Sequence, residues 1–309
     1  MAEPLIIPQD ADGQRLDRWL LARYPQFRFG DIQKWCRTGQ IRLDSKRVKG
    51  NERLKAEQKL RVPPQLAYAD EKETSIPTLS ATQRKNIESW ILYEDDELVA
   101  INKPAGLPVQ AGTGHERSAD RLLLAYYEER FTPRLTHRLD KVTSGVLLFA
   151  KTRQSAEYIT RQFKHREAKK TYMAIVEGAM LRPEGGQHMP PMGAITDPLL
   201  RVGNRSVIDK QEGQEAVTQY EVLDSPASGC SFMKLQPKTG RMHQLRAHLA
   251  YVGVPIVGDD AYGWAGELLE EWQGLGKNIM LHAAELTVTH PTTNESITFT
   301  APLPAYFKV

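Results

Sequence analysis

The residues best suited to chemistry lie in the segment His137–Gly145, which reads His-Arg-Leu-Asp-Lys-Val-Thr-Ser-Gly. Asp140 stands there between a cation, Arg138, and a turn of small residues. The apolar run Val146–Ala150 that follows predicts a buried strand, and Gly145 predicts tight backbone leading into it. A carboxylate close to Arg138 stays ionised at neutral pH and can act as a nucleophile or a base. A structural ion pair at a strand start is the alternative interpretation.

A tyrosine in the next predicted strand is a second candidate. Segment 169–176 is predicted to form a strand, in which successive side chains point to opposite faces, so Tyr172 lies on one face. Apolar spacing in 156–163 predicts an amphipathic helix before it. A strand, a helix and a strand in succession can return the second strand beside the first, so we expect Tyr172 near Asp140. An ordinary strand tyrosine is the alternative.

The third candidate is an arginine in the segment 239–249, Thr-Gly-Arg-Met-His-Gln-Leu-Arg-Ala-His-Leu. Apolar residues at helical spacing predict one buried face, and Gly253 is placed to end the helix. Arg246 sits one step from that face, and its planar guanidinium suits a carboxylate or a phosphate. An exposed helix arginine is the alternative. The residues of the predicted buried face are Met242, Leu245, Leu249 and Val252.

Together these segments resemble the motifs of the RluA family of pseudouridine synthases. The first fills every fixed position of H-R-L-D-x-x-T-S-G, and Lys170–Gly178 matches K-x-Y-x-A-x-V-x-G. The third resembles G-R-x-H-Q-L-R, with Met242 where Thr or Ser is more usual. Shorter matches at Asn102-Lys103-Pro104 and Leu281-His282-Ala283 extend the resemblance over residues 90–303.

The resemblance implies isomerisation of uridine to pseudouridine in RNA, in which the N1–C1′ bond is cut, the uracil turns over and C5 joins C1′. It implies no cofactor and no metal. Asp140 is then the catalytic carboxylate, Arg246 its partner, and Tyr172 the ring that stacks on uracil. Arg138 is expected to fill the space that a flipped base leaves in the RNA. Attack by Asp140 on C1′ or C6, or removal of the 2′ proton, all remain open.

The N-terminal segment is strongly basic. Residues 14–62 hold fourteen Lys and Arg against five Asp and Glu, a balance of +9, and the rest of the chain carries −6. Such a concentration of charge indicates a polyanionic partner, most simply nucleic acid. The order of two short helices and basic strands resembles the S4 RNA-binding domain over 13–63. The residues expected to bind RNA are Arg15, Arg18, Lys34, Arg37, Lys46 and Arg47 here, and His137, Arg138, Arg241 and His243 further on.

We expect an α+β protein with three parts: the S4-like domain at 13–63, a polar linker at 64–88, and a catalytic domain at 89–309. The catalytic domain should hold a mixed, mainly antiparallel sheet with flanking helices. No apolar run is long enough for a membrane span, and the N-terminus lacks the pattern of a signal peptide. We therefore expect a cytoplasmic monomer whose partner is RNA. Cys36 and Cys230 form no C-x-x-C pair and predict packed thiols.

Within the family, an S4 domain joined to this catalytic domain indicates the enzymes of large-subunit ribosomal RNA (23S), and local sequence favours the RluC type over the RluD type. Two alternatives belong to other classes. One is a non-catalytic RNA-binding or ribosome-assembly factor. The other is a hydrolytic RNA glycosidase, although such enzymes usually need a second carboxylate, and none stands in the Asp140 motif.

Overall fold

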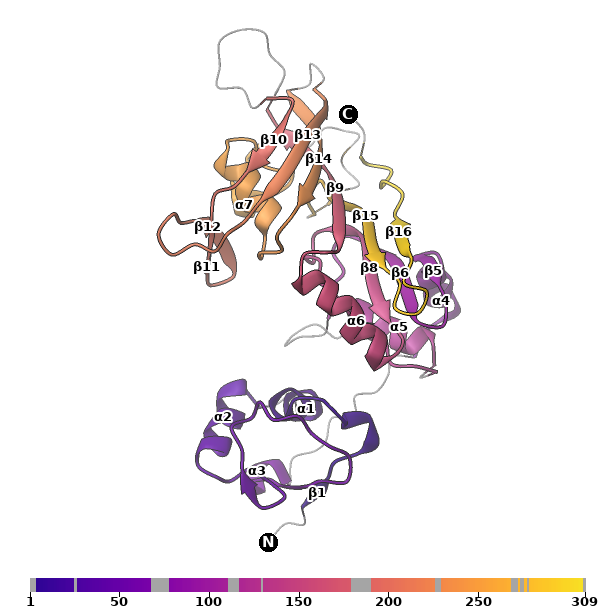
Figure 1. Cartoon of the computed structure of the whole chain (residues 1–309), viewed down its shortest axis with the longest axis vertical. Coiled ribbons are helices and arrows are strands. Elements are labelled where there is room, and N and C mark those ends of the chain that lie inside the picture. Colours follow the sequence, from indigo (N-terminus) through magenta and orange to yellow (C-terminus); the bar gives the residue numbers. More distant parts are fainter. Residues whose placement is uncertain are drawn as a thin grey trace. The chain divides into compact units, whose positions relative to one another are not determined.

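The chain of 309 residues divides into two compact units, Met1–Ile76 and Pro77–Val309. Figure 1 shows the computed structural model. None of its helices, in the part of the chain that it describes, is both long and apolar enough to cross a membrane. The structure describes residues 4–24, 27–67, 78–110, 117–128, 130–178, 190–225, 229–267, 272, 275–276 and 278–307.

The first unit packs two helices on a small sheet. Helices α1 (Leu16–Arg23) and α2 (Phe29–Arg37) bury the apolar stripes that their spacing predicts. The sheet has the order β1-β4-β2-β3. Its strands are β1 (Leu5–Ile6), β2 (Arg42–Leu43), β3 (Lys46–Arg47) and β4 (Lys59–Arg61), and the short helices η1 (Gln9–Ala11) and α3 (Pro64–Ala67) complete the unit.

Basic side chains of this unit remain at its surface. Arg15 is engaged locally, since its guanidinium donates to the buried carboxylate of Asp17 at 3.1 and 2.6 Å. The assignment of the unit as an S4 domain stays a prediction. The other five residues of the first unit that we expect to bind RNA are all exposed: Arg18, Lys34, Arg37, Lys46 and Arg47.

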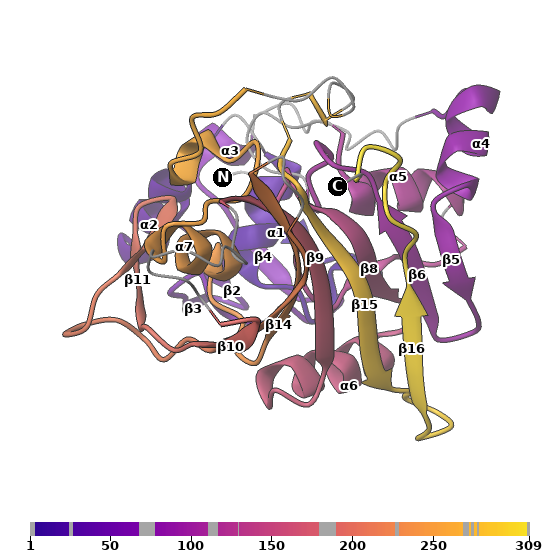
Figure 2. The same ribbon diagram turned by 90° about the horizontal axis from the view of Figure 1, so that it is seen from above.

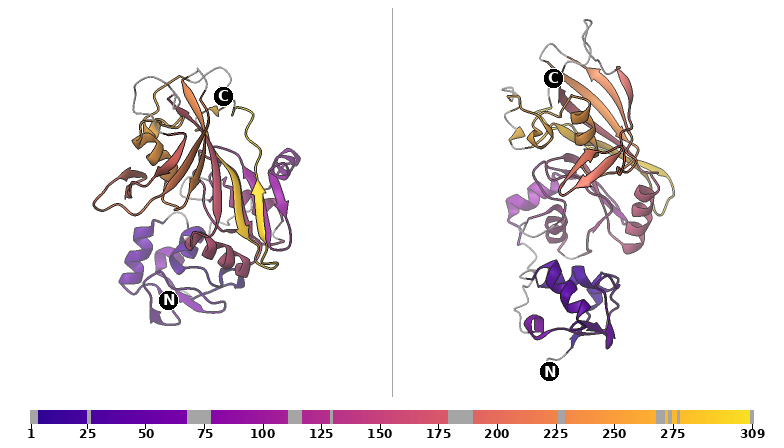
Figure 3. Two further views of the ribbon diagram at one scale, coloured as in Figure 1. Left: turned by 45° about the horizontal axis from the view of Figure 1, so that its top comes forward. Right: turned by 90° about the vertical axis from the view of Figure 1, so that its left-hand side faces the viewer.

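The second unit is built on a long, twisted sheet (Figures 2 and 3). Its strand order is β10-β13-β14-β9-β15-β8-β6-β5, with β16 beside β15 and β7 beside β8. Strands β8 and β15 pair in parallel, and the other described neighbours in this sheet pair antiparallel. The expectation of an α+β fold with a mixed, mainly antiparallel sheet is confirmed. The strands are β5 (Ile91–Glu94), β6 (Leu98–Lys103), β7 (Arg134–Leu135), β8 (Ser144–Ala150), β9 (Lys169–Glu177), β10 (Met192–Ile195), β13 (Thr218–Asp224), β14 (Cys230–Pro237), β15 (Leu281–Thr289) and β16 (Ser296–Thr300).

Helices cover both faces of the central strands. Helix α5 (Ala119–Tyr126) packs with one set of alternating side chains from β6 and β8, and α6 (Arg153–Lys164) packs with the other set. Burial on both faces explains why β8 reads as a continuous apolar run. Helix α4 (Ala81–Glu88) contributes the buried Ile87, so the expected linker contains a helix of the second unit. Helix α7 (Gln244–Tyr251), η2 (Asp260–Tyr262) and the hairpin β11 (Leu199–Val202) and β12 (Arg205–Ile208) complete this unit.

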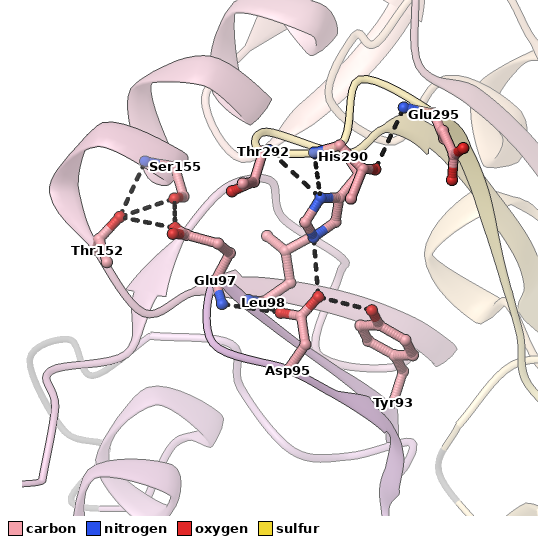
Figure 4. A network of polar contacts seen from close by, with 10 residues as sticks. Tyr93, Asp95, Glu97, Leu98, Thr152, Ser155, His290, Thr292 and Glu295 are labelled. Atoms are coloured by element: carbon pink, nitrogen blue, oxygen red, sulfur yellow. Dashed lines mark hydrogen bonds and ion pairs between the residues drawn. The ribbon is translucent and has the colours of Figure 1, made fainter.

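A polar network fastens one end of the sheet (Figure 4). The Asp95 carboxylate accepts hydrogen bonds from the Tyr93 hydroxyl at 2.6 Å and from His290 Nε2 at 2.8 Å. The same carboxylate accepts the backbone N–H groups of Glu97 and Leu98. It therefore ties the β5–β6 turn to the segment that follows β15.

The strand after α6 does not return beside β8, contrary to our expectation. Strand β15, from the C-terminal part of the chain, lies between β8 and β9. The register nevertheless aligns Gly145 with Ala283, and Ala283 with Tyr172. Tyr172 thus stands level with the start of β8, two strands away, and close to the Asp140 segment.

Gly145 is required by this register. Its φ is +110°, which L side chains rarely adopt. A Cβ atom there would lie 2.2 Å from the carbonyl oxygen of Ala283 and 2.6 Å from its nitrogen. The parallel pairing of β8 with β15 therefore depends on the absence of a side chain at this position.

Replacing Gly145 with alanine should lower the free energy of unfolding by about 3 kcal/mol or more, because the new methyl group meets backbone that cannot move alone. Gly203→Ala is the matched control: φ is +59° there, but no atom lies within 4 Å of the added Cβ, so only about 1 kcal/mol of backbone strain is expected. Urea unfolding of both variants makes the comparison. Equal losses would show that the close approach is unimportant.

Candidate active site

The three segments singled out in the sequence line one cavity of about 370 Å³ in the second unit. Residues 136–143 contribute from the segment before β8, and residues 163–172 from the end of α6 and the start of β9. Residues 237–246 contribute from the end of β14 to the first turn of α7, and Leu281 from β15. A larger hollow of about 480 Å³ over β10, β13 and β14 has one Glu and one Lys and no comparable grouping. The chemistry therefore belongs to the smaller cavity.

Asp140 meets Arg246 in this cavity. Arg246 Nη1 lies 3.4 Å from Asp140 Oδ2, while Nε and Nη2 of the same guanidinium each donate to Asp259 at 2.7 Å. Burial would lower the pKa of Arg246, but hydrogen bonds and charge from Asp259, with Asp140, raise it overall. Arg246 is therefore a permanent cation, only 7% exposed, aimed at Asp140 from a fixed direction. The ring of Tyr262 lies 4.8 Å from the guanidinium carbon.

The expectation that Arg138 keeps Asp140 ionised is wrong. Arg138 is exposed at the cavity and makes no ion pair with Asp140, although both side chains belong to the described part of the chain. Leu139 between them is buried, and the cation that reaches the carboxylate comes from a helix more than a hundred residues later. Arg138 is thus left available at the surface.

Tyr172 lines the same cavity from β9. Burial, and to a smaller degree the charge of Asp140, raise the pKa of its phenol above the usual value. The hydroxyl therefore keeps its proton near neutral pH. A neutral aromatic ring beside a carboxylate is suited to stacking against a planar base.

His137 is engaged with the protein. Its Nε2 accepts the backbone N–H of Leu148 at 3.0 Å, and its ring stacks on Phe163 with centroids 4.7 Å apart. Burial, followed by the charge of Lys170, lowers its pKa to about 3. The ring is therefore neutral. Its expected contact with RNA stays a prediction, but Nε2 is not free to make it because that nitrogen already accepts the Leu148 N–H.

Lys103 supports the catalytic segment, a role that we did not predict. Its side chain is fully buried, and Nζ donates to the carbonyl oxygens of Pro104 and Leu107 at 2.9 Å and of Lys141 at 3.2 Å. Burial lowers its pKa to about 7, and Asp140 opposes that shift. One amine therefore fixes the residue next to Asp140. The signal in the sequence was a lysine at the end of a mostly apolar strand.

The loop before α7 is held by Gln244. Its Oε1 accepts from the Thr239 hydroxyl at 2.6 Å and from the Arg241 N–H at 3.1 Å, while its Nε2 donates to Val217 O and Thr218 Oγ1 at 3.0 Å. This fastening presents His243 to the cavity, with Nε2 3.6 Å from Asp140 Oδ1.

A rim of cations surrounds the cavity. Lys170 Nζ donates to Thr239 O at 3.1 Å, and burial with the charge of Lys238 lowers its pKa to about 8. Arg166 and Arg241 both reach Glu215, through its carboxylate and its carbonyl oxygen respectively. Such a rim suits a ligand with phosphates around a neutral base.

Comparisons with known proteins agree with this geometry. The model of the RNA pseudouridylate synthase family matches residues 97–251, which include all three motifs. The chain belongs to this family. It is 35% identical to ribosomal large subunit pseudouridine synthase C of Salmonella typhimurium over 96% of this chain and 92% of that protein. The corresponding Escherichia coli K12 protein is 34% identical with the same coverage, and that of Vibrio cholerae is 31% identical over 98% and 93%.

Solved structures show the same catalytic fold. Human RNA Pseudouridylate Synthase Domain Containing 4 superposes with a TM-score of 0.59 at 28% identity, over 74% of this chain and 95% of that one. Human RNA Pseudouridylate Synthase Domain Containing 1 gives a TM-score of 0.53 at 26% identity, over 69% and 83%. The protein is therefore an RNA pseudouridine synthase of the RluA family, as the motifs indicated.

His137, which the fold keeps neutral, should make this pseudouridine synthase sensitive to acid. As pH falls from 7 to 5, the unfolded chain binds a proton at this side chain near pH 6.5 while the folded protein does not, which costs about 2 kcal/mol at pH 5. His137→Gln can keep the bond to Leu148 N without titrating. Its loss of unfolding free energy between pH 7 and 5, measured in urea, should be smaller than that of the wild type by about 2 kcal/mol. His165→Gln, at an exposed position, should change nothing, and identical losses for all three proteins would contradict the assignment.

Proposed function

We propose that this pseudouridine synthase modifies uridines of large-subunit ribosomal RNA and is of the RluC type. The observation that carries this is similarity over nearly the whole chain: the synthase C proteins match 96% of it, including the basic first unit. Similarity confined to the catalytic motifs would have supported only the general reaction. An rRNA substrate implies action in the cytoplasm, and we propose that the enzyme acts as a monomer.

Asp140 is the catalytic carboxylate in this proposal. Arg246 faces it as a buried cation at 3.4 Å and fixes its orientation. Tyr172 offers its ring to the uracil. Among the described residues that line the cavity, Asp140 is the one carboxylate. Enzymes that hydrolyse a glycosidic bond usually use two carboxylates. The cavity therefore favours isomerisation over release of uracil.

The target base has to leave the RNA stack to reach Asp140, at a cost of a few kcal/mol. Arg138 is exposed beside the cavity, and we assign it to the space that the base vacates. Lys170, Lys238 and Arg241 would neutralise phosphates of the flipped nucleotide and its neighbours. These contacts position the RNA and read no base.

Asp140→Asn should reduce pseudouridine formation at least about a thousand-fold, because an amide keeps the shape but loses nucleophilic and basic character. Its affinity for RNA should stay within about threefold of wild type. Asp260→Asn removes the same charge from an exposed position outside the cavity and should remain active. Substantial turnover by Asp140→Asn would reject the assignment, and free uracil released by the wild type would indicate a glycosidase.

The basic first unit should supply salt-dependent affinity, since each phosphate that it neutralises releases counterions. Replacing four exposed basic residues with Gln should weaken binding to RNA and reduce the slope of log affinity against log salt concentration. The reduction should be roughly 0.7 to 0.9 for each phosphate that the variant no longer neutralises. These four are Lys34, Arg37, Lys46 and Arg47.

The matched control neutralises four other exposed residues of the same unit, so both variants carry the same net charge. Only the first set should lower the slope strongly on the same rRNA fragment. Equal slopes in both variants would show that overall charge, and not the proposed surface, holds the RNA. The control residues are Lys49, Lys55, Lys59 and Arg61.

A further inference from the structure

The two oxygens of Asp140 face different partners. Arg246 Nη1 lies 3.4 Å from Oδ2, and His243 Nε2 lies 3.6 Å from Oδ1. The other ring nitrogen of His243, Nδ1, is 3.0 Å from the hydroxyl of Tyr262. That hydroxyl accepts the backbone N–H of Ser206 at 2.9 Å. Two hydrogen bonds therefore join β12 through Tyr262 to His243, whose other ring nitrogen faces the carboxylate from just beyond hydrogen-bond distance.

We propose that His243 is a positioning residue for Asp140, held by Tyr262 in the neutral tautomer with its proton on Nε2, and not a residue that binds RNA. The inference deepens the proposed function and rests on the catalytic role of Asp140. It assigns a task to a residue that the sequence placed among the RNA contacts.

The tautomer follows from the partners of the ring. If Nδ1 carried the proton, Nε2 would point a lone pair at a carboxylate oxygen, which is repulsive. The Tyr262 hydroxyl already accepts from Ser206 and has its own proton to donate, and Nδ1 of His243 is in place to receive it. With Nδ1 as the acceptor, the proton of the neutral ring lies on Nε2 and faces Asp140.

The backbone of His243 is held in an unusual conformation. Its φ is 50° and its ψ is 25°, a left-handed geometry at the N-cap of α7 that costs a non-glycine residue roughly 1 kcal/mol or more. Both neighbours are fixed: Ser206 Oγ donates to the Met242 carbonyl at 2.6 Å, and Gln244 is anchored through its amide. Such strain persists only where the surroundings impose it, and here it points the ring at Asp140.

Burial of the ring favours its neutral form. Burial lowers the pKa of His243, Arg246 and Arg201 lower it as well, and Asp140 and Asp259 oppose them. A neutral donor does not compete with Arg246 for the ion pair. It restrains rotation of the carboxylate, so that the reacting oxygen meets the flipped nucleotide in one orientation. Misplacement of a reacting group by about 1 Å can cost a hundredfold in rate.

The activity test uses two variants of full-length protein with a large-subunit RNA fragment. His243→Asn tolerates the left-handed backbone but is too short to reach Asp140. Its single-turnover rate at saturating RNA should fall about 10- to 100-fold, with Kd for RNA within about threefold. His243→Gln can present an N–H to Oδ1 and should recover much of the rate. Weaker binding with an unchanged saturating rate would overturn the proposal in favour of an RNA contact.

The tautomer is tested without RNA, by ¹⁵N NMR of the imidazole in wild-type protein and in Tyr262→Phe. The wild type should show a protonated Nε2 and an unprotonated Nδ1 at neutral pH, and loss of the hydroxyl should give a mixture. A protonated Nδ1 in the wild type, or an unchanged spectrum in the variant, would overturn the assignment. If the wild type shows the expected tautomer but makes no pseudouridine in this RNA, the proposed substrate fails and the geometric inference stands.

Discussion

The site depends on how the guanidinium of Arg246 contacts two carboxylates, Asp259 and Asp140. A guanidinium buried to this extent requires compensation, and Asp259, itself buried, supplies it through two bonds of 2.7 Å. The third nitrogen, Nη1, then faces Asp140 at the longer distance of 3.4 Å. Because Asp259 takes the tight bidentate contact, Asp140 receives the field of a fixed cation without being locked into a short ion pair. A nucleophile or base needs lone pairs that a short ion pair would occupy.

The sheet places the other half of the site. Gly145 allows β8 to lie close against β15, and the register continues to Tyr172 on β9. Lys103, at the end of β6, holds the carbonyl of Lys141 directly after Asp140. The aromatic ring is therefore carried by a strand, Asp140 by the loop that leads into β8, and Arg246 by a helix. The contact of Lys103 with the carbonyl of Lys141 fixes that loop against the sheet.

Local sequence patterns predicted much of this arrangement, and long-range pairing explains what they missed. The motifs brought Asp140, Tyr172 and Arg246 to one cavity, and apolar periodicity gave α6 and α7. The insertion of β15 between β8 and β9 could not be predicted, because it depends on a strand more than a hundred residues later. The partner of Asp140 was assigned to the nearby Arg138 as well as to Arg246, since proximity along the chain does not give side-chain direction.

Residues that act through others were the hardest to find. Asp259 and Lys103 lay in recognised segments, but nothing local shows that one anchors Arg246 and the other holds three carbonyl groups. Helix α4 was hidden in a polar stretch, although Ser80 and Gln83 form a capping box at its start. Periodicity is weak in so polar a helix, whose single buried side chain is Ile87.

In the proposed function, the two units contribute to the reaction in different ways. Flipping a base costs a few kcal/mol before any chemistry occurs, and the cavity can recover that through stacking and phosphate contacts only while the RNA stays bound. A basic unit tethered to the catalytic unit raises the effective concentration of RNA without making a contact specific to the transition state. In the proposed mechanism, binding energy from the first unit is independent of the geometry around Asp140. Tyr172 would stack on the extruded uracil, Arg246 orients Asp140, and Arg138 would fill the space that the base leaves.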